Sequence, residues 1–310
     1  MKDMSQKTII LYYKYTNIPR PKDILIQQRS VCANLGLKGR ILIAPEGING
    51  TLEGDHAEIE EYIHYMNDHA IFDQITYKKS IVDGTAFPKL IIKTRSEIVT
   101  SYLGEEDVNP AELTGKYITA EELYELMSNK DREKDFEIVD MRNDYEQVAG
   151  MFEGSIPSGL TTFKDLKQVA DNLAHLKEKK IITVCTGGVR CEKASGYLLS
   201  KGYKNVYQLK DGIVTYMEKF PNKHFKGKLY VFDNRILIGF NTNSPEHEIF
   251  AKCDKCGVPN ENYINCTDDY CHRHFICCEN CLSNGKPFCK IECEINHQNY
   301  VSKQSQKVAV

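Results

Sequence analysis

A cysteine, a short glycine loop and an arginine stand together near the middle of the chain, in a pattern that can produce a reactive thiol. The apolar, β-branched run Ile181-Ile-Thr-Val-Cys185 ends in the cysteine, and Arg190 closes the loop that follows. A helical pattern begins directly after this loop. The sequence therefore predicts a strand, a tight loop and a helix, with the sulfur of Cys185 at the carboxyl end of the strand.

The loop is suited to stabilising an anion on this cysteine. Its residues are Thr186, Gly187, Gly188, Val189 and Cys191. Their backbone N–H groups can curl around the sulfur, and the helix N-terminus and the guanidinium of Arg190 add positive potential. Such surroundings lower the pKa of a thiol, so we predict that Cys185 and Arg190 are catalytic. Cys191 is either a resolving thiol or a small residue at the helix start; the alternative for Cys185 itself is a buried structural cysteine.

The length of the loop separates two chemistries. Four residues lie between Cys185 and Arg190, and this Cys-x4-Arg ring fits around a persulfide sulfur. Phosphatases of similar layout use one residue more, because a tetrahedral phosphate needs a wider cradle, so phosphate-monoester hydrolysis is disfavoured. The segment resembles the active-site loop of the rhodanese superfamily.

A second segment places charged residues at the end of another predicted strand. The run Phe136-Glu-Ile-Val-Asp140 is followed by Arg142 and Glu146. It resembles the rhodanese Asp-x-Arg…Glu pattern, in which the charged residues order the loop beside the catalytic cysteine. We expect Asp140, Arg142 and Glu146 to form a salt-bridge network that supports the site, in preference to direct catalysis.

Nine further cysteines lie near the C-terminal end, at spacings typical of metal ligands. The preferred grouping is Cys253, Cys256, Cys278 and Cys281 in one site, and Cys266, Cys271, Cys289 and Cys293 in the other. Zinc binds four thiolates in a tetrahedron, although a sequential grouping, a histidine ligand (His272 or His274) or free or disulfide-forming cysteines are alternatives. We expect structural zinc, because this segment is too short and polar to bury a core alone.

The elements that position these residues fall into three parts. The predicted boundaries are a ferredoxin-like (acylphosphatase-like) α+β domain at 1–104, a linker at 105–118, a rhodanese-like α/β domain at 119–222, a Cys-rich segment at 223–300 and a disordered tail at 301–310. The first part has the order β-α-β-β-α-β. The second alternates strands and helices, which predicts a parallel sheet with the reactive loop at its carboxyl edge.

Composition limits the partners and the compartment. The chain has 310 residues, a net charge of −3 and 12 cysteines, so nucleic-acid binding requires a local basic face. The candidate RNA contacts are Arg20, Lys22, Lys38, Arg40, Lys78 and Lys79. No apolar run reaches the roughly 18 residues of a membrane span, and no signal-peptide pattern is present. We expect a cytoplasmic protein, in which thiols serve catalysis and metal binding.

The three parts together resemble the bacterial rhodanese-related tRNA uridine hydroxylases. The resemblance is carried by the cysteine spacing and by Glu46-Gly-Ile-Asn-Gly-Thr51, Val139-Asp-Met-Arg-Asn143, Cys185-Thr-Gly-Gly-Val-Arg-Cys-Glu-Lys-Ala-Ser195 and Tyr230-Val-Phe-Asp233. It implies oxygen-dependent conversion of the wobble uridine in the tRNA anticodon loop to 5-hydroxyuridine. It also implies that Cys185 is catalytic and molecular oxygen a co-substrate; the chain has no flavin, haem or iron signature.

The reactive cysteine permits three functions. In the first, the thiolate of Cys185 adds to C6 of uridine, C5 is oxygenated and the adduct eliminates. In the second, the protein is a sulfurtransferase that carries a persulfide on Cys185, with thiosulfate or a protein as donor. In the third, it is a non-catalytic RNA adaptor, which an intact Cys185 disfavours.

Overall fold

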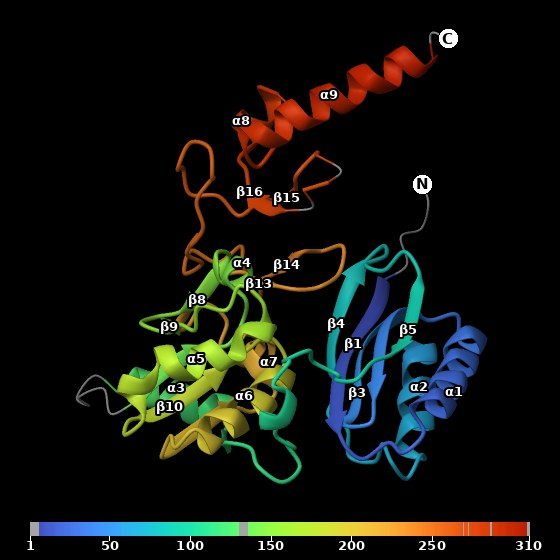
Figure 1. Ribbon diagram of the computed structural model, residues 1–310, viewed down its shortest axis with the longest axis vertical. Helices are drawn as coiled ribbons and strands as arrows, with labels where there is room; N and C mark the ends of the chain where they lie inside the picture. Colours follow the sequence, from blue (N-terminus) through green and yellow to red (C-terminus); the bar gives the residue numbers. More distant parts are fainter. Residues whose placement is uncertain (1–5, 130–135, 269, 272, 286, 309–310) are drawn as a thin grey trace.

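The computed structural model describes residues 6–129, 136–268, 270–271, 273–285 and 287–308, and it has three parts in chain order (Figure 1). We call them the head domain, the central domain and the C-terminal segment. The head domain contains β1 (Gln6–Tyr15), α1 (Pro21–Asn34), β2 (Lys38–Ala44), β3 (Gly47–Gly54), α2 (His56–Asn67), β4 (Lys78–Asp83) and β5 (Leu90–Thr94).

The head domain has the predicted ferredoxin-like arrangement. Its sheet has the order β4-β1-β3-β2-β5, in which β1 is antiparallel to both β3 and β4. The added strand β5 pairs in parallel with β2. Figure 1 shows α1 and α2 on the side of the sheet that faces away from the central domain.

Strand β1 is apolar on both faces, and each face packs against a different part of the protein. Ile10 and Tyr12 point toward the helices and are buried in the head core. Leu11 and Tyr13 alternate with them and therefore point the other way, toward the central domain. The second face of the sheet is thus available to form one wall of a site.

The central domain is the predicted parallel α/β domain. Its elements are β6 (Lys116–Ile118), α3 (Ala120–Ser128), β7 (Phe136–Asp140), α4 (Asp144–Gln147), β8 (Gly150–Phe152), β9 (Ile156–Pro157), η2 (Phe163–Asp165), α5 (Leu166–Asn172), η3 (Ala174–Leu176), β10 (Lys180–Val184), α6 (Val189–Ser200), β11 (Asn205–Leu209) and α7 (Gly212–Lys219). The sheet order is β6-β11-β10-β7-β9, and all of these neighbours are parallel. Separate apolar clusters cover its two faces, as expected when helices flank a parallel sheet.

The end of the predicted linker belongs to this domain. Residues 116–118 form β6, which pairs with β11 at the edge of the sheet. Before it lie the short helix η1 (Gly104–Glu106) and Val108, which packs against the central core. A three-residue edge strand with a single buried side chain, Ile118, carries too little alternation to be distinguished from a polar linker in the sequence.

The C-terminal segment is built on the central domain. Its elements are β12 (Phe225–Gly227), β13 (Leu229–Tyr230), β14 (Leu237–Ile238), β15 (Tyr263–Asn265), β16 (His274–Ile276), α8 (Glu279–Ser283) and α9 (Ile291–Val308). Strand β12 pairs with β8 of the central domain. Residues 301–308, which fall within the predicted tail, continue α9. This stretch contains no proline or glycine to end the helix.

None of the helices in the described ranges is both long enough and apolar enough to cross a bilayer.

Candidate active site

Cys185 borders a cavity of about 330 Å³ at which all three parts of the protein meet. This volume is in the lower range of small-ligand sites. The head domain contributes β1, β2, β3 and β4, the central domain contributes the reactive loop, and the C-terminal segment contributes residues between β13 and β14. Its lining includes Leu11, Tyr13, Lys78, Arg190, Phe232 and Arg235.

The reactive loop is anchored by α7 and covered by β1 of the head domain. The backbone N–H of Ile213 in α7 donates to the carbonyl of Cys185 at 2.9 Å. A Cβ atom at Gly187 would lie 2.7 Å from Cδ2 of Leu11, so a side chain there would displace the end of that leucine. Gly188 has a φ of +100°, a backbone conformation that favours glycine.

The surroundings of Cys185 favour its thiolate. Burial alone would raise its pKa, but a hydrogen bond from the Cys191 thiol, the charge of Arg190 and the N–H groups of Cys191 and Gly188 outweigh burial. Together they lower the pKa of Cys185 to about 6. Burial and the neighbouring thiolate raise the pKa of Cys191. Cys191 thus stays protonated and donates to Cys185, which is the nucleophile of the pair.

The rate of alkylation of Cys185 should therefore depend on pH in the acid range. We expect the rate to rise as pH increases through about 6 and to level off above it, whereas an ordinary thiol titrates near about 8.5. Iodoacetamide labelling of the Cys185 peptide, followed by mass spectrometry, measures this midpoint. Cys191→Ala removes the thiol donor and should raise the midpoint; a wild-type midpoint near the ordinary value contradicts the thiolate.

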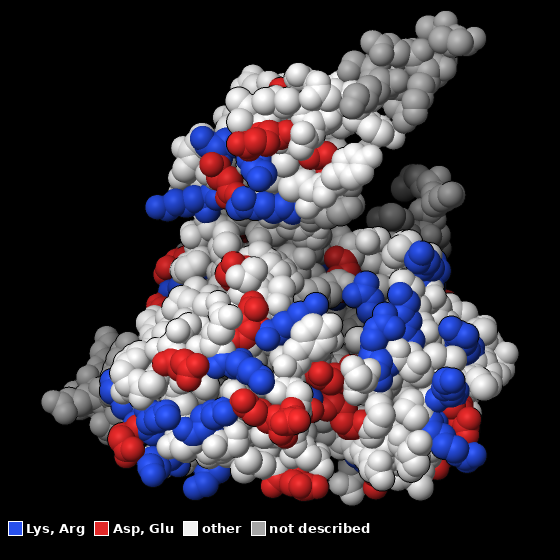
Figure 2. Space-filling model, in the orientation of Figure 1, with Lys and Arg blue, Asp and Glu red and all other residues white. Residues whose placement is uncertain are grey.

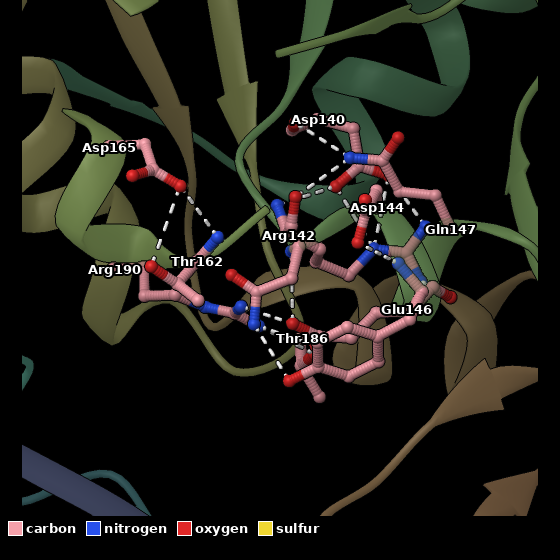
Figure 3. Close-up of polar contacts among 11 residues, drawn as sticks. Asp140, Arg142, Asp144, Glu146, Gln147, Thr162, Asp165, Thr186 and Arg190 are labelled. Atoms are coloured by element: carbon pink, nitrogen blue, oxygen red, sulfur yellow. Dashed lines mark hydrogen bonds and ion pairs between the residues drawn. The ribbon is translucent and has the colours of Figure 1, made fainter. Parts of the chain in front are cut away.

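Arg190 is held beside the thiol by Glu146. Its Nη2 lies 2.8 Å from Oε2 of Glu146, Nη1 contacts the other carboxylate oxygen, and Nη2 also donates to the Thr186 hydroxyl at 3.2 Å (Figure 3). Burial acts to lower the pKa of Arg190, but the charge of Glu146 outweighs it, so the pKa is raised. The guanidinium is a permanent cation with a fixed orientation.

The Asp140–Arg142 pair holds the backbone of the segment that carries Glu146. Nε of Arg142 donates to Asp140 at 3.0 Å (Figure 3). Its Nη2 donates to the carbonyl of Gly150 at 2.7 Å. Its Nη1 donates to the carbonyl of Glu146 at 3.3 Å. Both charged side chains are fully buried, and neither is among the described residues that line the cavity. They order α4 and, through it, the guanidinium of Arg190.

The head domain contributes site residues that the sequence did not single out. The Tyr13 hydroxyl donates to Glu192 at 2.9 Å, and Glu192 also accepts from Tyr117 at 2.8 Å. Lys193, in the same helix, pairs with Glu46 of the head domain at 2.8 Å. The continuous apolar run of β1 was the available signal, because a strand that is apolar on both faces must be packed against protein on both faces.

The predicted RNA contacts do not form one surface. Arg40 and Lys78 line the cavity. Lys79 borders it too, but its ammonium pairs with Glu60 of α2, on the helix-covered face of the sheet. Arg20 pairs with Asp23 at the start of α1.

The remaining two candidates are also separate from the cavity. Lys22 is an exposed residue of α1, and Lys38 lines a different pocket beside Glu58 and Glu61. On its viewed face, Figure 2 shows basic side chains interleaved with acidic ones along the junction of the head and central domains.

The C-terminal cysteines form two groups of four, with the membership that the preferred grouping predicts. The groups are Cys253, Cys256, Cys278 and Cys281, and Cys266, Cys271, Cys289 and Cys293. Within each group the sulfur atoms all lie within 4.8 Å of one another, so each could hold a metal ion. The N–H groups of Cys278 and Cys289 point at the sulfurs of Cys253 and Cys266, both at 3.4 Å, which suits thiolate ligands.

Of the two histidines considered as alternative ligands, His274 belongs to neither group. Nδ1 of His274 lies 2.9 Å from the hydroxyl of Tyr230, and His272 is outside the described residues. Cys277 is buried, and its thiol donates to the carbonyl of Cys278.

Comparison with known proteins covers all three parts. Protein-family models match at residues 7–98 (UPF0176 acylphosphatase-like domain), 119–219 (rhodanese-like domain) and 226–294 (rhodanese C-terminal). Curated relatives named tRNA uridine(34) hydroxylase, from Bacillus cereus (strain AH187) and Bacillus thuringiensis (strain Al Hakam), are each 40% identical over 294 residues. Each match covers 94% of this chain and 90% of the relative.

Solved structures match over about the length of the central domain. The rhodanese-like domain of an Anabaena sp. protein is 18% identical and has a TM-score of 0.31, over 37% of this chain and 80% of that chain. A rhodanese-related protein from Thermoplasma volcanium is 24% identical with a TM-score of 0.28, over 34% of this chain and 93% of that chain.

Proposed function

The chain belongs to the tRNA uridine(34) hydroxylase family, and from that premise we propose that it hydroxylates C5 of the wobble uridine of tRNA with Cys185 as nucleophile. The observation that carries the assignment of Cys185 is its position: a thiol with a pKa lowered to about 6 borders a cavity closed by all three parts of the chain. The proposal places the enzyme in the cytoplasm, with its tRNA substrate.

The chemistry follows from the polarity of uracil. C6 is the β-carbon of a conjugated carbonyl, so a thiolate can add there and leave C5 as the electron-rich carbon of an enolate. That carbon can react with molecular oxygen, the co-substrate, to give a C5 hydroperoxide after protonation. A two-electron reductant from solution then cleaves the O–O bond and releases the second oxygen atom as water, and loss of the C5 proton with elimination of the thiolate restores the ring. Arg190 keeps Cys185 ionised before addition and after elimination, because its own charge is fixed by Glu146.

The anticodon loop is the part of tRNA that suits this cavity. Bases in a single-stranded loop can be splayed out and stacked on aromatic side chains. Phe232 borders the cavity, remains 50% exposed, and has its ring centre 5.9 Å from the guanidinium carbon of Arg190. It offers a stacking surface for a base whose reactive edge lies against Cys185.

Phe232→Ala should weaken productive tRNA binding more than it slows chemistry. Loss of one base–aromatic stack is worth about 1–3 kcal/mol, which corresponds to a KM increase of roughly 5- to 150-fold. Steady-state hydroxylation of a tRNA transcript measures this increase. The matched control is Phe250→Ala, which removes another partly exposed aromatic residue of the C-terminal segment, away from the residues that line the cavity. An unchanged KM for Phe232→Ala contradicts the stacking role.

We also propose that each cysteine group holds a structural zinc ion. Four thiols that converge within 4.8 Å match the soft, tetrahedral ligand set that zinc prefers. Bound zinc would fix the fold of the C-terminal segment, and no part of the reaction is assigned to it.

The test of the proposed function is nucleoside mass spectrometry of unmodified tRNA incubated with the protein in air and under nitrogen. The expected result is a gain of one oxygen atom on the wobble uridine, in air only and in the presence of a reductant for the second oxygen atom. No gain in either atmosphere, with tRNA shown to bind, contradicts the proposal.

The second candidate is a sulfurtransferase, which the Cys-x4-Arg loop favours. Treatment with thiosulfate would then leave stable sulfane sulfur on Cys185, detectable as a mass gain of one sulfur atom, and no oxygen would be added to tRNA.

A further inference from the structure

The head domain places a buried ammonium group at the cavity. Lys78 lies on β4 opposite Leu11 of β1, so its side chain points to the face of the sheet that carries the cavity. The side chain is only 7% exposed, and its Nζ lies 3.1 Å from Asp211 and 4.8 Å from the centre of the Tyr13 ring. Burial lowers the pKa of Lys78, and the charges of Asp211 and Cys185 partly offset this effect.

The other cations at the cavity are engaged elsewhere or exposed. Those among the described lining residues are Arg40, Lys78, Lys79, Arg190 and Arg235. Arg190 binds the Glu146 carboxylate through Nη1 and Nη2. Arg235 binds the Asp233 carboxylate through Nε and Nη2. Lys79 pairs with α2, and Arg40 is exposed. Among these five cations, Lys78 is the one whose ammonium is buried at the cavity.

The ion pair with Asp211 leaves part of the Lys78 ammonium available to a ligand. An ammonium has three N–H donors, and the ion pair with Asp211 uses one of them. A buried ammonium is costly to desolvate unless its remaining donors are used. A polar group of a ligand in the cavity can accept from the donors that Asp211 leaves.

We propose that Lys78 is a catalytic residue that donates a hydrogen bond to O4 of the uracil ring and stabilises the enolate formed when Cys185 adds to C6. The inference rests on the proposed function. The sulfur–C6 bond forms with the electron pair of the thiolate, the C5=C6 π pair moves between C5 and C4, and the C4=O π pair moves to O4. Asp211 fixes the ammonium that faces the negative oxygen.

The step can be followed without oxygen. In deuterium oxide under nitrogen, C5 of the enolate takes a deuteron from solvent, and elimination of Cys185 with loss of the original proton returns uridine with deuterium at C5. Mass spectrometry of the wobble nucleoside measures this exchange. It requires neither oxygen nor a reductant, so it isolates the addition step from oxygenation.

Lys78→Met should slow the exchange at saturating tRNA by about 100-fold or more, the usual loss when one donor to a developing oxyanion is removed. Lys78→Arg should recover part of the rate. The control is Lys7→Met, which breaks a 2.7 Å lysine–aspartate pair on β1 of the same sheet, outside the cavity. A purely structural role would instead lower the melting temperature and tRNA affinity, and would leave exchange at saturation intact.

Two results overturn the assignment. One is exchange by Lys78→Met within about threefold of wild type at saturating tRNA, far from the expected loss. The other is a wild-type enzyme that hydroxylates tRNA in air but shows no exchange under nitrogen, because no enolate then forms. A protein that does neither contradicts the proposed function itself, which distinguishes the two failures.

Discussion

Cys185→Ser is expected to abolish hydroxylation of the wobble uridine, with a fall in rate of at least about 10³-fold. A serine hydroxyl at this position stays protonated at neutral pH, whereas the wild-type thiol has a pKa lowered to about 6. The variant therefore lacks the nucleophile while it keeps the loop, the cavity and the Arg190–Glu146 pair. Nucleoside mass spectrometry of tRNA incubated with the variant in air measures the loss.

Two further observations make this experiment decisive. Cys32→Ala removes a thiol that is buried in the head core, remote from the cavity, and should leave the hydroxylation rate close to that of wild type. The tRNA affinity of Cys185→Ser should also stay close to wild type, since the sulfur contributes to reaction more than to binding. Full hydroxylation by Cys185→Ser would contradict covalent catalysis by this residue.

Features encoded in short stretches of sequence could be predicted, and the structure has them. The loop from Cys185 to Arg190 depends on a strand, two glycines and a helix start that are adjacent in the chain. The grouping of eight cysteines follows from pairs of ligands that are close in sequence. Asp140, Arg142 and Glu146 lie within one turn region, so their network also depends on local spacing.

Features that depend on how the domains dock could not be predicted in the same way. Tyr13 and Lys78 meet Glu192 and Asp211 only because the open face of the head sheet covers the reactive loop. The alternation of side chains along β4 decides which ammonium lies at the cavity: that of Lys78 does, whereas that of Lys79 pairs with Glu60 of α2. The identity of a basic residue does not tell which face of a strand it lies on or which domain covers that face. For this reason the predicted RNA contacts are scattered over the head domain.

The C-terminal segment connects the cysteine groups to the cavity through a chain of aromatic contacts. The hairpin β15–β16 lies between ligands of both groups, and the Tyr263 hydroxyl donates to the carbonyl of Tyr145 in the central domain at 2.6 Å. His274 of the hairpin lies 2.9 Å from the hydroxyl of Tyr230, whose ring packs edge-on against Phe232, with ring centres 5.3 Å apart. Metal binding should therefore stabilise one wall of the site from a distance.

Cys278→Ser should accordingly reduce bound zinc from one ion per group to a single ion in the other group, and should raise the KM for tRNA. Structural zinc contributes about 10–16 kcal/mol of binding free energy to folding, so loss of one ligand should loosen the hairpin and, through Tyr230, Phe232. The increase in KM should approach the roughly 5- to 150-fold expected for loss of the stacking surface. Elemental analysis, thermal unfolding and steady-state kinetics on the same preparation measure these effects.

Cys277→Ser is the matched control for this prediction, because Cys277 is the adjacent buried thiol and belongs to neither group. It should keep both metal ions and a nearly unchanged KM, so any effect specific to Cys278 reports on metal ligation and excludes a general sensitivity of the segment to serine. Loss of zinc from Cys278→Ser without a change in KM would mean that the wall formed by Phe232 holds its position without the metal. Retention of both ions would mean that the Cys278 thiolate is not a required ligand of the first group.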